Sequence, residues 1–234
     1  MTEPVGNPPN RIKAVGAEPV VDAQRQSLRN VTQAMRIVIE RIVASTAPAS
    51  AMNEAADELR GIAEVLDRYP RGRVYDFGES SIAGDPGAFF DNSPVCGLSN
   101  PLAPKLDLRI EDSKVIGDIR WGSAYEGAPG CVHGGFVAAA FDEVLGLAQD
   151  LGGHPGMTGT LTVKYRKPTP IHADLRFVGE FTRTERRKTF TEGWLYDGDG
   201  NLLAEADAVF ITVDMTKLRD LADEREMQTP ADES

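Results

Sequence analysis

Residues 127–148 read GAPGCVHGGFVAAAFDEVLGLA, and this stretch decides the fold of the chain. A glycine-rich turn opens a segment that is apolar on nearly every side, with two acids, Asp142 and Glu143, in its middle. Amphipathic surface helices have a polar face, and this segment barely has one. We therefore expect a buried helix over residues 133–151, ended by the two glycines that follow it. A buried carboxylate is costly unless it is paired, hydrogen-bonded or used in chemistry.

The segments on both sides of this helix alternate apolar and polar residues, which is the period of half-buried strands. Before the helix, alternating runs flank the turn Asp112-Ser113 and predict a hairpin. After it, four more strands are expected, and the turns favour antiparallel pairing of consecutive strands. The expected strands cover residues 105–110, 115–121, 158–165, 173–184, 189–196 and 202–213. This order predicts an α+β domain in which a curved antiparallel sheet wraps around one long central helix.

The chain before this domain has a different pattern. Apolar residues three and four positions apart predict helices over residues 22–44 and 52–69. The stripe of the first helix is Leu28, Val31, Met35, Val38 and Ile42, and that of the second is Leu59, Ile62, Ala63 and Leu66. We interpret this helical hairpin as a scaffold or an oligomer contact, with a regulatory or ligand-binding role as the alternative.

These patterns divide the chain into five parts. They are a disordered lead over 1–20, the helical hairpin over 21–70, a linker over 71–94, the domain over 95–214, and a short acidic helix with a tail over 215–234.

Composition excludes several classes of protein. The net charge of −11 argues against general nucleic-acid binding, although a local basic site can still hold an anionic ligand. The N-terminus lacks the pattern of a signal peptide, and no apolar run is long enough to span a membrane. Cys96 and Cys131 are far apart and lack metal-ligand spacing. They are interpreted as reduced thiols of a cytoplasmic protein.

The two acids lie on different faces of the expected helix. At about 3.6 residues per turn, Asp142 shares its face with small residues, which leave space beside the carboxylate. These are Gly135, Ala138, Ala139 and Gly146. Glu143 shares its face with larger apolar residues, so we expect it to be a structural acid. Asp142 is the better candidate for contact with a substrate, and a structural role for it remains open.

Gly134 and Gly135 lie in the first turn of the helix, where backbone N–H groups have no partner within the helix. Those donors and the positive end of the helix dipole suit a polarised carbonyl oxygen, as in an oxyanion hole. The alternative is that the glycines only permit a tight turn. His133 is expected to orient a group or to cap the turn. We favour this structural role over a general base.

Spacing along the helix limits how these groups can cooperate. Gly135 and Asp142 are seven residues apart, which is about 10 Å at 1.5 Å per residue. A reacting carbonyl must lie about 3 Å from both the oxyanion donors and the activated water. If the chain is an enzyme that uses these groups on one carbonyl, we therefore expect a homodimer with active sites at the interface, in which Gly135 of one chain faces Asp142 of its partner.

These residues resemble the hotdog-fold acyl-CoA thioesterases, in particular the branch of phenylacetyl-CoA thioesterases and thioesterase-superfamily members. The shared motifs are YEGAPG at 125–130, VHGG at 132–135, the acid nine residues after the histidine, MTGTL at 157–161 and YRKP at 165–168. The resemblance covers about residues 95–214 and leaves the helical hairpin outside.

The resemblance implies a hotdog fold that pairs into dimers and often tetramers. It implies that Asp142 is the general base or nucleophile, that Gly135, with Gly134, supplies the oxyanion donor, and that Thr158 positions the water or the carboxylate. It places Lys164, Arg166, Arg187 and Lys188 near coenzyme A, with a solvated strand edge as the alternative for each.

Three functions follow as hypotheses. The first is hydrolysis of an acyl-CoA thioester without a further cofactor. The second is an enoyl-thioester hydratase or dehydratase, which usually needs a pair of histidine and acid; His154 and His172 have no clear acid partner in the sequence. The third is a non-enzymatic acyl-CoA-binding protein with the hairpin as its partner surface.

Overall fold

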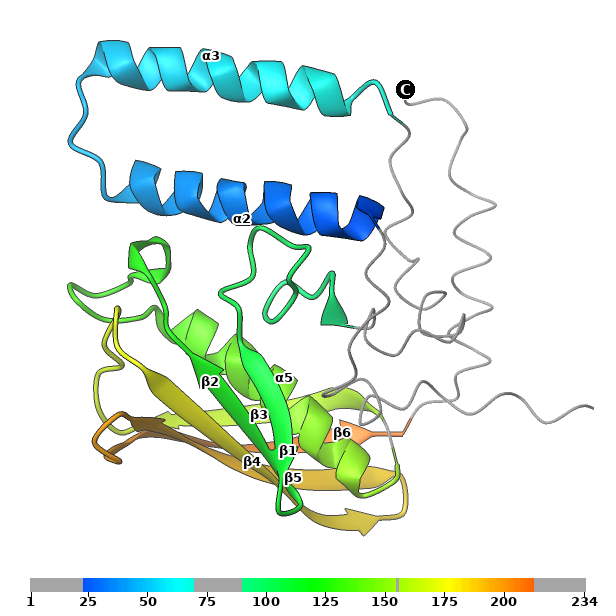
Figure 1. Ribbon diagram of the computed structural model, residues 1–234. Coiled ribbons are helices and arrows are strands. Elements are labelled where there is room, and N and C mark those ends of the chain that lie inside the picture. The colour runs from blue at the N-terminus through cyan, green and yellow to red at the C-terminus, as the bar shows by residue number, and fades with distance from the viewer. Residues whose placement is uncertain (1–22, 70–89, 155, 213–234) are drawn as a thin grey trace, which may run out of the picture.

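The computed structural model describes residues 23–69, 90–154 and 156–212 (Figure 1). Its helices are α2 (Ala23–Val43), α3 (Ala49–Leu66) and α5 (Gly134–Leu151), with a short 3-10 helix η2 (Ser123–Tyr125). The strands are β1 (Asp107–Glu111), β2 (Lys114–Ile119), β3 (Met157–Tyr165), β4 (Leu175–Glu185), β5 (Lys188–Asp197) and β6 (Leu202–Ile211). Within these ranges, no helix combines the length and apolar character needed to cross a bilayer.

The six strands form one antiparallel sheet in the order β1-β2-β4-β5-β6-β3. The sheet curves around α5, as Figure 1 shows. The predicted fold class, a curved antiparallel sheet around one long helix with a helical extension, is therefore confirmed. The turn between β1 and β2 is also as expected, with Asp112 and Ser113 at φ of 47° and 62°, the geometry of a tight two-residue hairpin.

The prediction that consecutive strands pair is wrong at β3. This strand pairs with β6, while β4 pairs with β2. The segment that follows β3 contains two prolines and does not turn back as a hairpin. Instead, it pairs with the loop before α5, through the Val132 N–H to Thr169 O bond of 2.8 Å and the Ile171 N–H to Gly130 O bond of 3.1 Å. This crossing leaves β3 at one edge of the sheet.

The core lies between α5 and the inner face of the sheet. Phe141 of α5 meets Phe177 of β4 edge to face, with ring centroids 4.8 Å apart, and both rings are fully buried. Two strand glycines let the helix approach closely. A Cβ on Gly179 would lie 2.7 Å from Val144 Cγ1, and one on Gly193 would lie 2.9 Å from Leu145 Cδ2. These positions explain how a helix with such large side chains fits against the sheet.

The helix α2 contacts the rest of the chain through a polar face. Arg25 and Arg29 pair with the buried carboxylate of Asp91, and the hydroxyl of Thr32 donates to Ser99 O at 3.1 Å. The guanidinium of Arg36 donates to backbone carbonyls of the same loop, including Gly97 O at 2.6 Å, Asn100 O at 2.7 Å and Ala103 O at 3.0 Å. Partial burial lowers the pKa of Arg36.

The predicted helices of the hairpin are present with small shifts. The first spans Ala23–Val43, and the second begins at Ala49, directly after Pro48, and ends at Leu66 rather than at residue 69. The predicted lead over 1–20, most of the linker over 71–94 and the helix and tail over 215–234 lie outside the described residues.

Candidate active site

A tight loop leads from η2 into α5. The Gly127 N–H donates to Cys131 O at 2.8 Å, and the His133 N–H donates to Tyr125 O at 2.8 Å. Gly127 packs against His133 so closely that a Cβ would lie 2.8 Å from His133 Cα. Gly130 takes a φ of 73°, which favours glycine. The loop therefore fixes the position of the first turn of α5.

His133 is the N-cap residue of α5. Its Nδ1 accepts a hydrogen bond from the Gly135 N–H at 3.1 Å. The bond requires Nδ1 to be unprotonated, and it satisfies one of the amides that lack a partner at the start of a helix. The favoured structural role of His133 thus agrees with this contact. The same contact occupies the N–H of Gly135, which the sequence had assigned to an oxyanion.

Asp142 lies partly exposed on α5, eight residues after the first residue of the helix. Its Oδ1 accepts a hydrogen bond of 2.8 Å from the hydroxyl of Thr158 on β3. The structure therefore brings together two of the predicted site residues that are distant in sequence. A carboxylate held in one orientation by a neighbouring hydroxyl can direct its other oxygen towards a water or an acyl group.

A β-bulge places the Thr158 hydroxyl on this side of β3. Thr158 pairs with Phe210 and Thr160 with Val209, so Gly159 is an extra residue in the strand. Without the bulge, Thr158 would share a face with Thr160, on the side away from Leu161. A Cβ on Gly159 would lie 2.9 Å from Ile211 Cγ1, which explains the glycine. Bulges of this kind commonly redirect a side chain next to an active site.

Tyr165 is a site residue that the sequence reasoning missed. It lies at the other end of β3, and its hydroxyl donates to Gly134 O at 2.7 Å. The ring also lies over Gly134, where a Cβ would be 3.2 Å from the tyrosine oxygen. Strand alternation after the bulge was the available signal, because it places Tyr165 on the same face as Leu161.

Glu143 is held by the loop over residues 91–105. One oxygen accepts from the Ser93 hydroxyl at 2.9 Å and lies 3.2 Å from Cys96 Sγ. These contacts agree with the expected structural role of Glu143. They also fasten that loop beside the turn of α5 that carries Asp142.

The other two histidines, His154 and His172, contact residues other than Asp142. His172 Nε2 lies 3.0 Å from the hydroxyl of Ser123 and 4.0 Å from a carboxylate oxygen of Glu40. The prediction that His172 lacks an acid partner is therefore wrong, because Glu40 comes from α2, which is distant in sequence. The backbone carbonyl of His154 accepts a bond from Thr189 at 3.4 Å.

The four predicted coenzyme A residues form two separate groups in one chain. Lys164 and Arg166 lie where β3 ends, and they pair with Asp207 at 3.8 Å and with Glu205. Arg187 and Lys188 lie where β5 begins, and the Arg187 guanidinium donates to Thr212 O at 3.0 Å. Lys188 lies level with Met157, because both residues pair with Ile211 of β6. From Met157 to Lys164 is seven residues along β3, so the two groups are roughly 23 Å apart. One chain does not bring them together.

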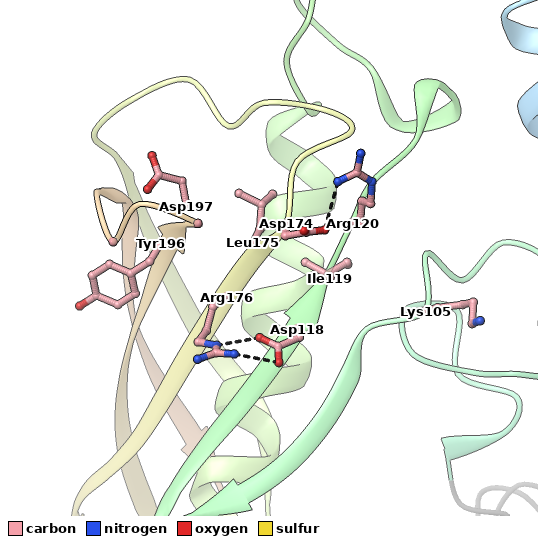
Figure 2. Close-up of a pocket in the computed structure, with 11 residues that line it drawn as sticks. Lys105, Asp118, Ile119, Arg120, Asp174, Leu175, Arg176, Tyr196 and Asp197 are labelled. Atoms are coloured by element: carbon pink, nitrogen blue, oxygen red, sulfur yellow. Dashed lines mark hydrogen bonds and ion pairs between the residues drawn. The ribbon is translucent and has the colours of Figure 1, made fainter.

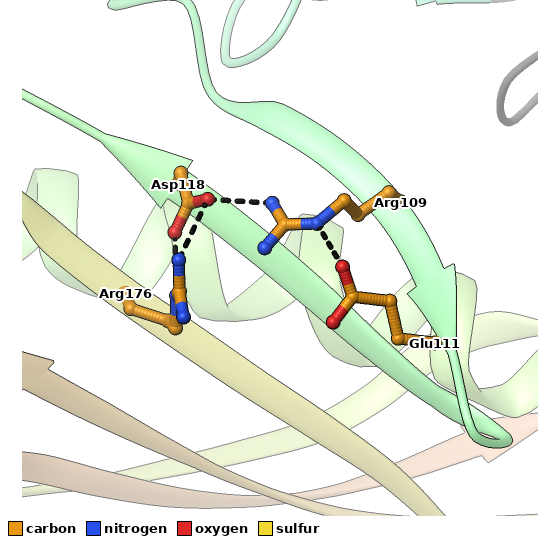
Figure 3. Close-up of polar contacts among 4 residues, drawn as sticks. All are labelled: Arg109, Glu111, Asp118 and Arg176. Carbon is orange, nitrogen blue, oxygen red and sulfur yellow. Dashed lines mark hydrogen bonds and ion pairs between the residues drawn. The ribbon is translucent and has the colours of Figure 1, made fainter.

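The outer face of the sheet carries a separate hollow of about 720 Å³, lined by residues such as Arg120, Asp174 and Tyr196 (Figure 2). Its charges are largely paired with one another. Asp118 accepts from Arg176 at 2.8 Å and from Arg109 at 2.5 Å, as Figure 3 shows. Partial burial raises the pKa of Asp118, but these two arginines outweigh it, so the pKa lies below its ordinary value. This network joins β1, β2 and β4.

Comparison with known proteins agrees with the architecture. Residues 129–204 match the family model of the thioesterase superfamily. Acyl-coenzyme A thioesterase THEM4 of Xenopus laevis is 34% identical over 91 residues, 38% of this chain and 41% of that protein. The Mus musculus protein of the same name is 30% identical over 107 residues, 45% and 46% of the two chains. The chain thus spans less than half the length of these curated relatives.

A solved structure extends the similarity beyond this segment. The crystal structure of a thioesterase superfamily protein, RHA08564, is 29% identical with a TM-score of 0.70, and the match covers 83% of this chain and 97% of that one. Residues 90–234 are 145 of the 234 residues, about 62% of this chain. A match over 83% therefore includes part of the chain before the sheet.

Proposed function

Because residues 129–204 match the family model of the thioesterase superfamily, we propose that this protein hydrolyses acyl-CoA thioesters to a free acid and coenzyme A. The observation that carries the proposal is the hydrogen bond of 2.8 Å between Thr158 and Asp142. It orients a partly exposed carboxylate on the face of α5 that bears small residues. The similarity of 91 to 107 residues of this chain to acyl-coenzyme A thioesterases supports the choice of substrate.

In the proposed reaction, the Asp142 carboxylate removes a proton from a water as the water oxygen attacks the thioester carbonyl carbon. The carbonyl becomes a tetrahedral oxyanion, which backbone N–H groups at the start of α5 stabilise. Collapse of this intermediate breaks the carbon–sulfur bond, and the coenzyme A thiolate leaves and takes up a proton. In the alternative, Asp142 attacks the carbonyl itself, and water then hydrolyses the resulting anhydride.

The oxyanion donor is the N–H of Gly134 or Gly135. The Gly135 N–H donates to His133 Nδ1 at 3.1 Å, so it serves an oxyanion only if the imidazole turns away or shares it. His133→Ala tests whether the imidazole itself takes part in the chemistry. If only a backbone N–H is the donor, freeing the Gly135 N–H leaves the rate within a few-fold of wild type. If the imidazole itself takes part in the chemistry, the rate falls by 10²-fold or more.

The proposed assembly is a homodimer with the active site between chains. Gly135 and Asp142 are separated by about 10 Å along α5, so the donors of one chain would meet the carboxylate of its partner. A pair of chains also brings the Lys164 group of one chain nearer to the Arg187 group of the other. Arginine and lysine suit the phosphates of coenzyme A. Pairing of two such dimers would give a tetramer.

The test is a thiol-release assay across short, long and aromatic acyl-CoAs. We expect Asp142→Asn to lower kcat by about 10²–10⁴-fold, while Glu143→Gln, the matched change at the neighbouring acid, retains activity. Thr158→Val should lower kcat by about 10-fold, because the carboxylate loses its orienting hydroxyl. A folded Asp142→Asn variant with wild-type turnover would refute the proposal.

The same assay separates the other two functions. Water addition to an enoyl-CoA without thiol release would assign a hydratase. Tight binding of acyl-CoA without turnover, unchanged in Asp142→Asn, would assign a binding protein.

A further inference from the structure

The helix α2 makes its hydrogen bonds and ion pairs with the described part of the domain through its polar side, while several residues of its apolar side stay exposed. At 100° per residue, the docking residues of α2 lie within about 80° of one another. They are Arg25, Arg29, Thr32, Arg36 and Glu40. The apolar stripe that includes Leu28 and Val31 is centred about 120° away around the helix. Both of these side chains are 48% exposed.

The helix α3 has even less contact with the domain. It lies beyond α2, on the side away from the sheet (Figure 1), and it contributes no buried residue. In its second half, large apolar side chains are open to solvent: Ile62 is 45% exposed, Val65 48% and Leu66 56%, and Tyr69 just beyond the helix is 67% exposed. Isolated exposed apolar residues are ordinary, but a contiguous set of this size marks an interaction surface.

We propose that this hairpin surface, defined as Leu28, Val31, Ile62, Val65, Leu66 and Tyr69, binds the same surface of a second copy of the chain. These six side chains are between 45% and 67% exposed, so at most about 600 Å² per copy, or about 1,200 Å² in total, is available to a contact, against the roughly 1,000 Å² that a specific interface needs. Two open helical hairpins that meet face to face form a four-helix layer. Such a contact is isologous and closes after two copies.

Chemistry favours a second copy over a nucleic acid or a membrane surface as the occupant. The surface is apolar, and the net charge of −11 on the chain disfavours polyanions and anionic lipid. A second copy carries the same net charge, so the apolar area must drive a contact between copies. Four-helix layers need apolar residues on both partners, and a second copy supplies an identical set. The contact lies on the hairpin, apart from Asp142 and the β3 edge, and does not rest on the proposed catalytic function.

The test measures the mass of the full chain by light scattering coupled to gel filtration, over a range of concentrations. Ile62→Glu and Val65→Glu, made separately, are expected to halve the mass of the wild-type particle, whatever its size. The matched control is Ile37→Glu. Ile37 is 53% exposed on α2 but lies about 140° around the helix from the apolar stripe, so this variant should keep the wild-type mass.

Far-UV circular dichroism shows whether each variant retains its helices, and two separate variants guard against misfolding of one. A wild-type chain that is a monomer, or a folded Ile62→Glu and Val65→Glu pair with unchanged mass, would overturn the proposal. Those results would assign the surface to the chain's own terminal segments or to a different protein. Halving of the mass by Ile37→Glu as well would also overturn it, because the effect would then be that of added charge.

Discussion

Glu40 of α2 fastens the hairpin to the loop that leads into the active site, so its removal should loosen that connection. Its carboxylate accepts from the backbone N–H groups of Ser123 at 2.9 Å and Ala124 at 3.2 Å, at the start of η2. Partial burial raises the pKa of Glu40, but hydrogen bonds from Ser123 and then Ala124 outweigh it and hold the pKa below its ordinary value. The charged form is therefore the one that the folded chain stabilises.

The magnitude follows from these two bonds. A hydrogen bond to a charged group contributes about 1.5–3 kcal/mol when buried, but the Glu40 side chain is 37% exposed. We therefore expect Glu40→Ala to cost about 1–2 kcal/mol, which lowers the Tm by roughly 2–8 °C for a chain of this size. Glu54→Ala, the same change at an exposed position on α3, should leave the free energy of unfolding within about 0.5 kcal/mol of wild type.

The pH dependence of the Tm difference shows whether the charged form of Glu40 is what stabilises the folded chain. A carboxyl group whose pKa is lower in the folded chain adds stability above its unfolded pKa of about 4.5, and this contribution is lost as the pH falls through the folded pKa. Calorimetry at pH 7 and at steps below 4.5 should therefore show the Tm difference between wild type and Glu40→Ala shrinking. An equal Tm difference at low pH, or none at pH 7, would refute the reasoning.

Four further substitutions test the packing of the core and the docking of the hairpin. Phe141→Ala should cost about 3–5 kcal/mol in chemical denaturation, because it removes a fully buried ring. Gly179→Ala should lower the Tm, since its Cβ would lie 2.7 Å from Val144 Cγ1. Gly61→Ala, with open space around it on α3, should instead stabilise the chain by about 0.5–1 kcal/mol. Equal Tm shifts for the two variants would contradict the close packing of Gly179 against α5. Arg36→Met should increase proteolysis between the hairpin and the domain, as it loses its bonds to Gly97 and Ala103, and unchanged cleavage would show that these bonds do not hold the hairpin.

Local periodicity predicted most of the fold. Apolar residues on every side of residues 133–151 predicted the buried helix, and period-two alternation predicted each strand to within about two residues at most ends. The place of β3 beside β6 was not predictable in this way. It depends on a long connection that crosses the chain and pairs with the loop before α5, and pairing between distant segments leaves no periodic signal.

The candidate site was likewise predictable only where it depends on local sequence, and not where it depends on contacts between distant segments. The small-residue face of α5 pointed to Asp142, whose carboxylate accepts a hydrogen bond from Thr158. The catalytic roles that the family resemblance implied for these two residues stay predictions. The Gly159 bulge that makes this contact possible was not foreseen, because one extra residue changes which face every later side chain occupies. The contact of Glu40 with His172 was also missed, since the two residues come from elements far apart in the sequence.

The two edges of the sheet differ in a way that bears on aggregation. β1 is five residues long, and its outward side chains include Arg109, paired with Glu111 and Asp118. Short edges with charged residues resist the addition of another strand. β3 is nine residues long and is exposed along most of its length. Addition of a strand is therefore discouraged at β1, so any growth of the sheet through its edges would be limited to pairing at β3 and would not continue into a fibre.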